Sequence, residues 1–221
     1  MGFLFWFYEQ LKDFFCPKYC VGCGRFGQFL CPDCFNKLEF LFNPLDIKIK
    51  DLYVDKFFSL ANYAFPLDKL IQQYKYQSVK DMSIFLAQML FKNLSLPPFD
   101  YLTFIPIHQQ RFQDRLFNQS KELAFQLSIL DCKPMIPFLK KEINTAHQAS
   151  SKKGSLRFRL QRGSFSLREK FVNSSDFKDK IIVIVDDVLT TGATLNEVAM
   201  ILKKELKVNK VYGLVVAHNN F

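Results

Sequence analysis

The sequence predicts an α/β fold, a doubly wound parallel sheet, preceded by a small cysteine-rich module. From Phe57 onward, strand-like and helix-like patterns alternate, as expected for a sheet with helices on both faces. The run Ile181–Val185 is continuously apolar and β-branched, which is typical of a central parallel strand. Five of the six cysteines fall within the nineteen residues from Cys16 to Cys34, and they predict the module. The 221 residues suffice for one such domain and a small appendage.

The elements are expected in a simple order along the chain. Residues 1–15 have the spacing of an amphipathic helix, 16–44 form the cysteine-rich module, 57–221 form the α/β domain, and 43–56 form a linker. Within the domain, strands are expected over Phe57–Ala64, Tyr101–Ile107, Ile181–Val185 and Val211–Ala217, and helices over Leu67–Tyr74, Val79–Leu94, Asp114–Leu130 and Ala193–Leu206. The polar, non-periodic stretch Lys140–Arg162 predicts a long loop.

The net charge and the cysteines indicate which kinds of partner and which cellular compartment to expect. A net charge of +9 favours anionic partners such as phosphates or nucleic acid, without choosing between them. No signal peptide is expected, because Met1–Tyr8 lacks a basic start and a small-residue cleavage site, and this stretch is too short to span a bilayer. The apolar stretch Met1–Tyr8 could dock on the protein's own core or touch a membrane. The expected compartment is a reducing cytoplasm, where clustered cysteines indicate a metal rather than disulfides.

The strongest motif is Ile182–Thr194, a buried strand followed by two acids, a hydroxyl-rich turn and a helix. Ligands of open α/β sheets bind beyond the carboxyl ends of the strands, which is where Asp186 and Asp187 are expected. Their carboxylates can accept hydrogen bonds from the vicinal hydroxyls of a ribose. The following turn would offer N–H groups at a helix N-terminus to a phosphate. It consists of Thr190, Thr191, Gly192, Ala193 and Thr194. The alternative is an ordinary strand-to-helix turn capped by Asp and Thr.

The cysteine spacing predicts a zinc site. Two Cys-x2-Cys pairs lie seven residues apart, and together they can supply four thiolates in tetrahedral geometry. The four cysteines are Cys20, Cys23, Cys31 and Cys34. Because four protein ligands leave no open position, the predicted role of the zinc is structural. Cys16 is a spare thiol or a substitute ligand, and Cys132 is expected to be a buried core residue.

Two basic clusters are candidates for binding the rest of an anionic ligand. On a helix, Arg111, Arg115 and Asn118 would share one face, and Arg binds pyrophosphate oxygens in forked pairs. A solvated helix face is the alternative. The second cluster lies within Lys140–Arg162, whose length favours a functional lid or binding loop, with a disordered basic loop as the alternative.

Taken in order, these motifs resemble the ComF family (competence protein F, also called GntX-like), and the resemblance covers the chain from Cys16 onward. The segment Ile182–Thr194 matches the signature with which type I phosphoribosyltransferases bind phosphoribosyl pyrophosphate (PRPP). The resemblance therefore implies the type I phosphoribosyltransferase fold. It implies that Asp186 and Asp187, as catalytic residues, hold the ribose hydroxyls of Mg²⁺-bound PRPP, and that the following turn holds its 5′-phosphate.

The resemblance also assigns roles outside that segment. The pyrophosphate side would be lined by Arg111, Arg115, Asn118 and Gln119, PRPP binding would extend to Lys75, and a mobile loop would contain Gln148, Lys152 and Arg157. Lys75 is equally well explained as a cation at the end of a helix. The sequence departs from the family at Leu116, where Gly is usual, and at Leu160, where Asn is common. The first change removes a place of close backbone approach to phosphate, and the second removes a polar group from the loop.

The resemblance implies a link to DNA uptake and natural transformation, and it leaves three functions open. As a transferase, the protein would let a nucleophile displace pyrophosphate from C1 of PRPP, with an acceptor that no residue identifies. As a binding module, it would hold single-stranded DNA on the basic loop and the zinc module. As a scaffold, it would dock to a DNA-uptake helicase or translocase. The oligomeric state does not follow from the sequence.

Overall fold

The structure is a computed structural model that describes residues 17–76, 79–107, 117–141 and 164–219. Its centre is a four-stranded sheet in the order β1 (Lys56–Asn62), β6 (Lys210–His218), β5 (Ile181–Leu189) and β2 (Tyr101–Phe104). All three neighbouring pairs are parallel. The carboxyl ends of the strands therefore lie at one edge of the sheet, which we call the carboxyl edge.

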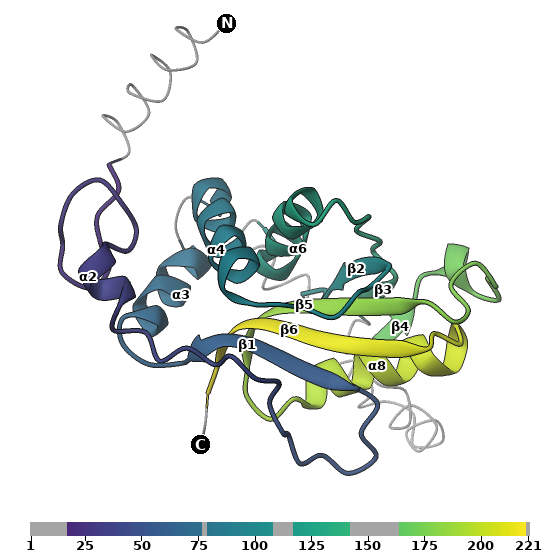
Figure 1. Cartoon of the computed structure of the whole chain (residues 1–221). Helices are drawn as coiled ribbons and strands as arrows, with labels where there is room; N and C mark the ends of the chain where they lie inside the picture. Colours follow the sequence, from purple (N-terminus) through teal and green to yellow (C-terminus); the bar gives the residue numbers. More distant parts are fainter. Residues whose placement is uncertain (1–16, 77–78, 108–116, 142–163, 220–221) are drawn as a thin grey trace, which may run out of the picture.

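Helices cover both faces of this sheet, as the doubly wound prediction requires (Figure 1). One face carries α3 (Leu67–Tyr76), α4 (Val79–Asn93) and α6 (Gln119–Leu130), and the other carries α8 (Ala193–Glu205) and the antiparallel pair β3 (Leu139–Lys141) and β4 (Phe165–Leu167). Two short helices complete the described elements, α2 (Pro32–Phe35) and the 3-10 turn η2 (Glu169–Phe171).

The central strand β5 explains why its sequence is apolar without alternation. Val183 and Val185 belong to the core on the α4 side, whereas Ile182 and Ile184 belong to the core on the α8 side, and all four are fully buried. A strand buried on both faces gains from an apolar side chain at every position. The paired strand extends beyond the predicted Val185, because Asp186–Leu189 continues the pairing with β6. The two acids therefore stand on a rigid strand.

The other predicted elements are found with shifted ends. β2 ends at Phe104, three residues before the predicted end, and Pro106, which has no N–H to donate to a ladder, follows closely. The predicted helix 114–130 is described only from Gln119, and Asn118 is its N-cap with an extended backbone. The hairpin of β3 and β4 was not predicted, because two three-residue strands give too short a pattern. Most of the predicted loop 140–162 lies outside the described residues.

The cysteine-rich module shares its core with the α/β domain. Leu30, Leu38 and three of the cysteines belong to the same buried cluster as residues of α3 and α4. The predicted linker is also packed against the domain rather than free. Within this connecting segment (residues 43–55), Leu45 pairs with Phe57 of β1, and Ile47 packs on the α8-side core.

Cys132 is exposed rather than buried, so that prediction was wrong: the residue follows the C-cap of α6 and has a positive φ of 52° in the turn toward β3. Within the described residues, no helix is long and apolar enough to cross a membrane.

Candidate functional site

The acid pair predicted from the sequence lies at the carboxyl edge, near the end of β5. The Ser120 hydroxyl, from the first turn of α6, donates a hydrogen bond of 2.7 Å to Asp186 Oδ1. The backbone N–H of Asp187 donates to the same oxygen at 2.9 Å. Lys75, in the last turn of α3, places its Nζ 3.1 Å from Asp187 Oδ2. Three elements therefore converge on the two carboxylates.

Burial, reinforced by the neighbouring charge of Asp187, raises the pKa of Asp186 to about 7. The hydrogen bonds from Ser120 and from the Asp187 N–H, together with the charge of Lys75, act in the opposite direction and are outweighed. Two carboxylates side by side resist simultaneous ionisation, so Asp186 changes charge near neutral pH. Perturbed acids of this kind are common at functional sites, although ion-pair networks produce them too.

The turn after the acids forms the start of α8. Gly192 is the N-cap with a φ of 76°, in the left-handed region that suits glycine. Thr191 Oγ1 accepts a long hydrogen bond of 3.4 Å from the N–H of Ala193, the first residue of the helix. The four residues around Gly192 are exposed: Thr190, Thr191, Ala193 and Thr194. The N-terminal N–H groups of a thirteen-residue helix thus lie beside three threonine hydroxyls, an arrangement suited to a phosphate.

Gly192 is required for a second reason that the sequence did not indicate. A Cβ at this position would lie 2.8 Å from Ile49 Cδ1 in the connecting segment. One turn further along α8, Asn196 Oδ1 accepts a hydrogen bond of 2.6 Å from the N–H of Tyr53, and Asn196 Nδ2 donates to Asp51 O at 3.1 Å. The connecting segment is therefore fastened to the beginning of α8.

Lys75 is a predicted ligand residue that the structure brings to the acids. Asn118 does not share a helical face with other residues, because it caps α6: its Oδ1 accepts from Lys121 N–H at 3.1 Å, and its Nδ2 donates to Ile105 O at 3.0 Å. Gln119 is buried, and its Nε2 is 3.4 Å from Lys75 O. A ligand contact by either side chain remains a prediction. The predicted Arg111, Arg115, Gln148, Lys152 and Arg157 lie outside the described residues.

Ser120 and Tyr74 contribute to the site and were not predicted from the sequence. Buried Tyr74 donates a hydrogen bond of 2.7 Å from its hydroxyl to Gln119 O, which joins α3 to the beginning of α6. This bond fixes the two helices that carry Lys75 and Ser120. No local sequence pattern predicts these two hydrogen bonds, because their partners are far apart in the chain. Tyr74 and Gln119 are separated by 45 residues, and Ser120 and Asp186 by 66.

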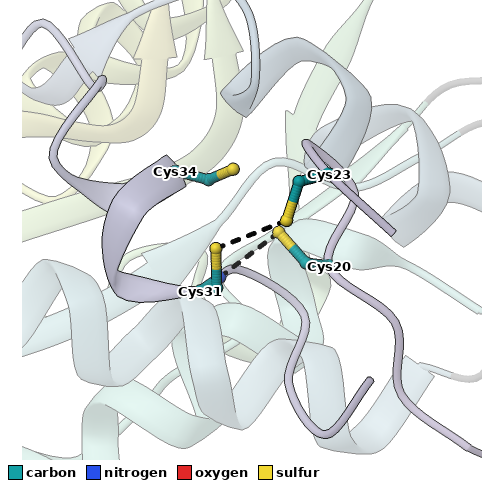
Figure 2. A group of neighbouring side chains, drawn as sticks. All are labelled: Cys20, Cys23, Cys31 and Cys34. Atoms are coloured by element: carbon teal, nitrogen blue, oxygen red, sulfur yellow. Dashed lines mark hydrogen bonds between the residues drawn. The ribbon is translucent and has the colours of Figure 1, made fainter. Parts of the chain in front are cut away.

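The four predicted cysteine ligands come together in the N-terminal module. Figure 2 shows their side chains pointing toward a common centre, and the four Sγ atoms lie within 4.8 Å of one another. Four sulfurs bound tetrahedrally to Zn²⁺ would be about 3.8 Å apart, given Zn–S bonds of about 2.3 Å. Three of the thiols are buried, and Cys23 is exposed. The donor set and its geometry fit a structural metal. Cys16, the predicted spare thiol, lies outside the described residues.

The electrostatics of the thiols agree with metal binding. Burial opposes ionisation of Cys20, but N–H donors outweigh it and lower the pKa of this thiol to about 6; one of these donors is the Cys31 N–H, 3.3 Å from the sulfur. Burial and the neighbouring sulfurs raise the pKa of Cys34 to about 12. Four thiolates crowded together without a cation would repel one another, and a divalent metal removes that repulsion.

The parallel doubly wound sheet and the acid pair at its carboxyl edge agree with a comparison of families, in which the phosphoribosyl transferase domain matches residues 129–220. The fold and site thus define a phosphoribosyltransferase-like protein. Competence protein F of Haemophilus influenzae is 30% identical over 220 residues, which cover 95% of this chain and 88% of that protein. The chain therefore belongs to the competence protein F family.

Other relatives and solved structures are more distant. DNA utilization protein YhgH of Escherichia coli is 29% identical over 197 residues, covering 83% of this chain and 82% of that protein. Glutamine PRPP amidotransferase from B. subtilis, solved with ADP and GMP, matches with a TM-score of 0.46 and 18% identity over 66% of this chain and 30% of that one. A purine phosphoribosyltransferase from Pyrococcus horikoshii matches with a TM-score of 0.34 and 20% identity over 64% of this chain and 82% of that one.

Proposed function

We propose that this protein binds Mg²⁺-PRPP at the carboxyl edge of its sheet. Asp186 and Asp187 accept hydrogen bonds from the ribose hydroxyls, and the turn 190–194 binds the 5′-phosphate. The observation that carries the proposal is the placement of two acids near the end of β5 directly before the exposed N-terminus of α8. Mg²⁺, when bound with PRPP, would neutralise pyrophosphate charge, and Arg111 and Arg115 are proposed to do so as well.

Lys75 and Ser120 favour the ionised form of Asp186, which is the form suited to binding a ribose hydroxyl. A ribose hydroxyl donates more strongly to an ionised carboxylate than to a protonated one. The Lys75 ammonium and the Ser120 hydroxyl both favour the ionised form of Asp186, against the effect of burial. Binding of PRPP should therefore strengthen as the pH rises through about 7, because Asp186 loses its proton there.

The proposal is tested by thermal unfolding with a series of ligands. A ligand present at a hundred times its Kd stabilises the native state by about 2.7 kcal/mol. We expect Mg²⁺-PRPP and ribose 5-phosphate to raise the Tm of the wild type, and Asp187→Asn to reduce both effects. Glu205→Gln, an exposed acid at the far end of α8, is the matched control and should respond like the wild type. Equal responses from Asp187→Asn and the wild type would contradict the proposal.

Binding becomes catalysis if an acceptor can reach C1 of the ribose. The proposed reaction is displacement of pyrophosphate by a nucleophile, accelerated by positioning and by cations on the leaving group. Release of pyrophosphate from PRPP that depends on a particular acceptor, and that Asp187→Asn loses, would establish a transferase. PRPP binding without release under any acceptor would indicate that the nucleotide precursor acts as a ligand only.

Single-stranded DNA binding is the second candidate function, favoured by an exposed aromatic pair in the cysteine-rich module. Tyr19 and Phe26 are 52% and 63% exposed, and their ring centroids are 5.8 Å apart. Lys18 and Arg25 lie beside them in the chain, and exposed aromatic rings among cations can stack nucleic-acid bases. The names of the relatives, a competence protein and a DNA utilization protein, point in the same direction.

An oligonucleotide titration separates this function from PRPP binding. Salt-sensitive binding of a single strand that survives Asp187→Asn and is lost in Tyr19→Ala/Phe26→Ala would support a separate DNA surface. Binding unaffected by the double alanine variant would exclude these rings as the platform. A DNA-uptake helicase or translocase as the partner, and action in the cytoplasm, belong to the same proposal.

We also propose that the metal of the cysteine cluster is Zn²⁺. The support is the set of four convergent thiols, since zinc prefers tetrahedral thiolate sites and four protein ligands complete its coordination.

A further inference from the structure

A hollow of about 330 Å³ lies between α4 and α6, which pack against one another on one face of the sheet (Figure 1). Residues from the end of α4, the connection from α4 to β2, the end of α6 and the middle of β6 line it. That connection leads into the beginning of β2, where the N–H of Asp100 donates to Ile181 O at the beginning of β5. The hollow therefore lies toward the edge of the sheet opposite to the carboxyl edge.

The hollow is separate from the proposed ribose-phosphate site. Helix α6 joins the two places: Ser120 in its first turn contacts Asp186, and Asp131 at its C-terminal end lines the hollow. At 1.5 Å per residue, Ser120 and Asp131 are about 17 Å apart along the helix. A ligand in the hollow is therefore not a part of PRPP.

The walls of the hollow are mostly apolar. Leu90, Phe99, Leu127 and Leu214 line it, and all four are buried members of the core on the α4 side. The connection that forms one wall contains two consecutive prolines, at positions 97 and 98, whose fixed φ angles limit the movement of that wall. A largely preformed apolar hollow of this size is typical of small-molecule sites, which measure about 300–1,000 Å³.

One carboxylate, that of Asp131, lines this apolar hollow. Asp131 is the C-cap of α6, and the last turn of this helix contains no basic residue. The C-terminus of a helix carries a partial negative charge, which disfavours a carboxylate there. Burial raises the pKa of Asp131, and the positive charge of Lys133 offsets this effect only in part. Among the described residues, none forms an ion pair or a hydrogen bond with this carboxylate. A cationic ligand would therefore stabilise it.

Lys133 also lines the hollow, so the preferred charge of a ligand depends on which of the two groups dominates. Lys133 is exposed, and its Nζ lies 6.0 Å from the centroid of the Phe99 ring. Asp131 is partly buried. Water and salt screen an exposed ammonium strongly, whereas they screen a partly buried carboxylate less. We therefore expect the hollow to prefer a cation over an anion.

We propose that this hollow binds a small organic cation, an amine whose apolar body packs on Leu90, Leu127 and Leu214 and whose ammonium group contacts Asp131. An ammonium donates charge-assisted hydrogen bonds to a carboxylate, and these are stronger than hydrogen bonds between neutral groups. The ring of Phe91, which also lines the hollow and is 46% exposed, offers its face to the same cation. This binding does not depend on PRPP or DNA binding.

The proposal is tested by calorimetric titration of the full-length, metal-loaded protein with three indoles. Tryptamine, tryptophol and indole-3-propionate share the ring and a two-carbon chain, and they carry a positive charge, no charge and a negative charge. We expect tryptamine to bind most tightly and indole-3-propionate most weakly. Asp131→Asn, which keeps the shape of the side chain, should weaken tryptamine binding about tenfold and leave tryptophol binding unchanged. Lys133→Gln should strengthen tryptamine binding, because it removes a repulsive charge.

Two further variants locate the bound probe. Ser95→Trp changes an exposed residue of the lining, so its ring should obstruct the hollow and weaken the binding of both tryptamine and tryptophol. Glu205→Gln, an exposed acid on α8, is the matched control and should bind tryptamine like the wild type.

The proposal is overturned if no indole binds the folded wild type, or if tryptamine and indole-3-propionate bind equally well. It is also overturned if neither Asp131→Asn nor Ser95→Trp changes tryptamine binding. Loss of tryptamine binding in Asp187→Asn, with no effect of Asp131→Asn, would locate the amine at the carboxyl edge and would likewise contradict the proposal.

Discussion

At the scale of residues, the protonation of Asp186 changes the charge of the carboxyl edge. Its folded-state pKa of about 7 lies well above the ordinary value of an aspartate, so between about pH 4 and pH 7 the native state holds a proton that the unfolded state has lost. The native state is then relatively less favoured as the pH rises through this window. Above about pH 7 both states are ionised, and the destabilisation is constant.

Asp186→Asn removes this pH-dependent contribution. We expect the Tm of the variant, measured relative to the wild type, to increase between pH 5 and pH 8. Because the side chain is only partly shielded from water, we expect a change on the order of 1–2 kcal/mol, at about 2–4 °C per kcal/mol for a chain of this size. Glu205→Gln is the control and should show no such trend. A pH-independent difference between Asp186→Asn and the wild type would contradict the raised pKa.

Some residues of the site could be predicted from the sequence, and others could not. The acids and the threonine turn could be predicted because strand, acids and helix start are contiguous in the chain. Ser120 could not be, since its contact with Asp186 exists only after α6 has packed on the sheet. Asn118 was predicted as a ligand on a helical face, although an Asn before a helix is also a common N-cap, which is what the structure contains.

At the scale of elements, the connecting segment and the start of α8 act as one unit. Gly192→Ala combines a strained φ with a Cβ only 2.8 Å from Ile49 Cδ1, so either the turn or the connecting segment must move. We expect weaker binding of ribose 5-phosphate together with a loss of stability, which calorimetric titration and thermal unfolding would measure. Gly24→Ala is a matched control, because Gly24 has a φ of 74° and no atom within 4 Å of an added Cβ.

Gly24→Ala should therefore lose stability through backbone strain alone and keep its ligand affinity. If Gly192→Ala kept its affinity for ribose 5-phosphate while losing stability, the turn would not be the phosphate site.

The turn at Gly22, beside the proposed metal site, offers an equally local test. A Cβ on Gly22 would lie 2.6 Å from Cys34 Sγ and 3.2 Å from Pro66 Cβ, so Gly22→Ala displaces a proposed zinc ligand. We expect a reduced zinc content, measured by elemental analysis of the purified protein. Gly27→Ala, whose added Cβ meets open space, should retain one zinc per chain. A full complement of zinc in Gly22→Ala would show that Cys34 is not needed to hold the metal.

The elements predicted best are those with long patterns, namely the strands around Ile181–Val185 and Val211–Ala217 and the helices on either side. Their ends were less predictable, because strand pairing and capping decide them. The packing of the connecting segment, in contrast, could not be predicted from the sequence. Its composition suggested a spacer, yet Ile47 and Ile49 are partly buried by tertiary contacts that no local pattern reveals.

At the scale of the whole molecule, the cysteine-rich module and the sheet share one hydrophobic core. Cys31 and Cys34 are almost completely buried and belong to the same core as helices α3 and α4. Removing the metal should therefore destabilise the sheet as well as the module. We expect chelation to lower the Tm of the protein while the unfolding remains a single transition, as followed by circular dichroism and calorimetry.

A second transition at the original temperature after chelation would mean that the α/β domain is independent of the module. The variant Cys132→Ser, which removes an exposed thiol outside the cluster, provides the control for general effects of cysteine replacement and should unfold like the wild type.

The most direct test of the central claim is calorimetric titration of the full-length, metal-loaded protein with PRPP, with and without Mg²⁺, beside Asp186→Asn/Asp187→Asn. We predict Mg²⁺-dependent binding by the wild type at one site per chain and loss of that binding in the double variant, with its fold preserved. Absence of binding by a folded wild type, or equal binding by the double variant, would contradict the assignment of the carboxyl edge as a ribose-phosphate site.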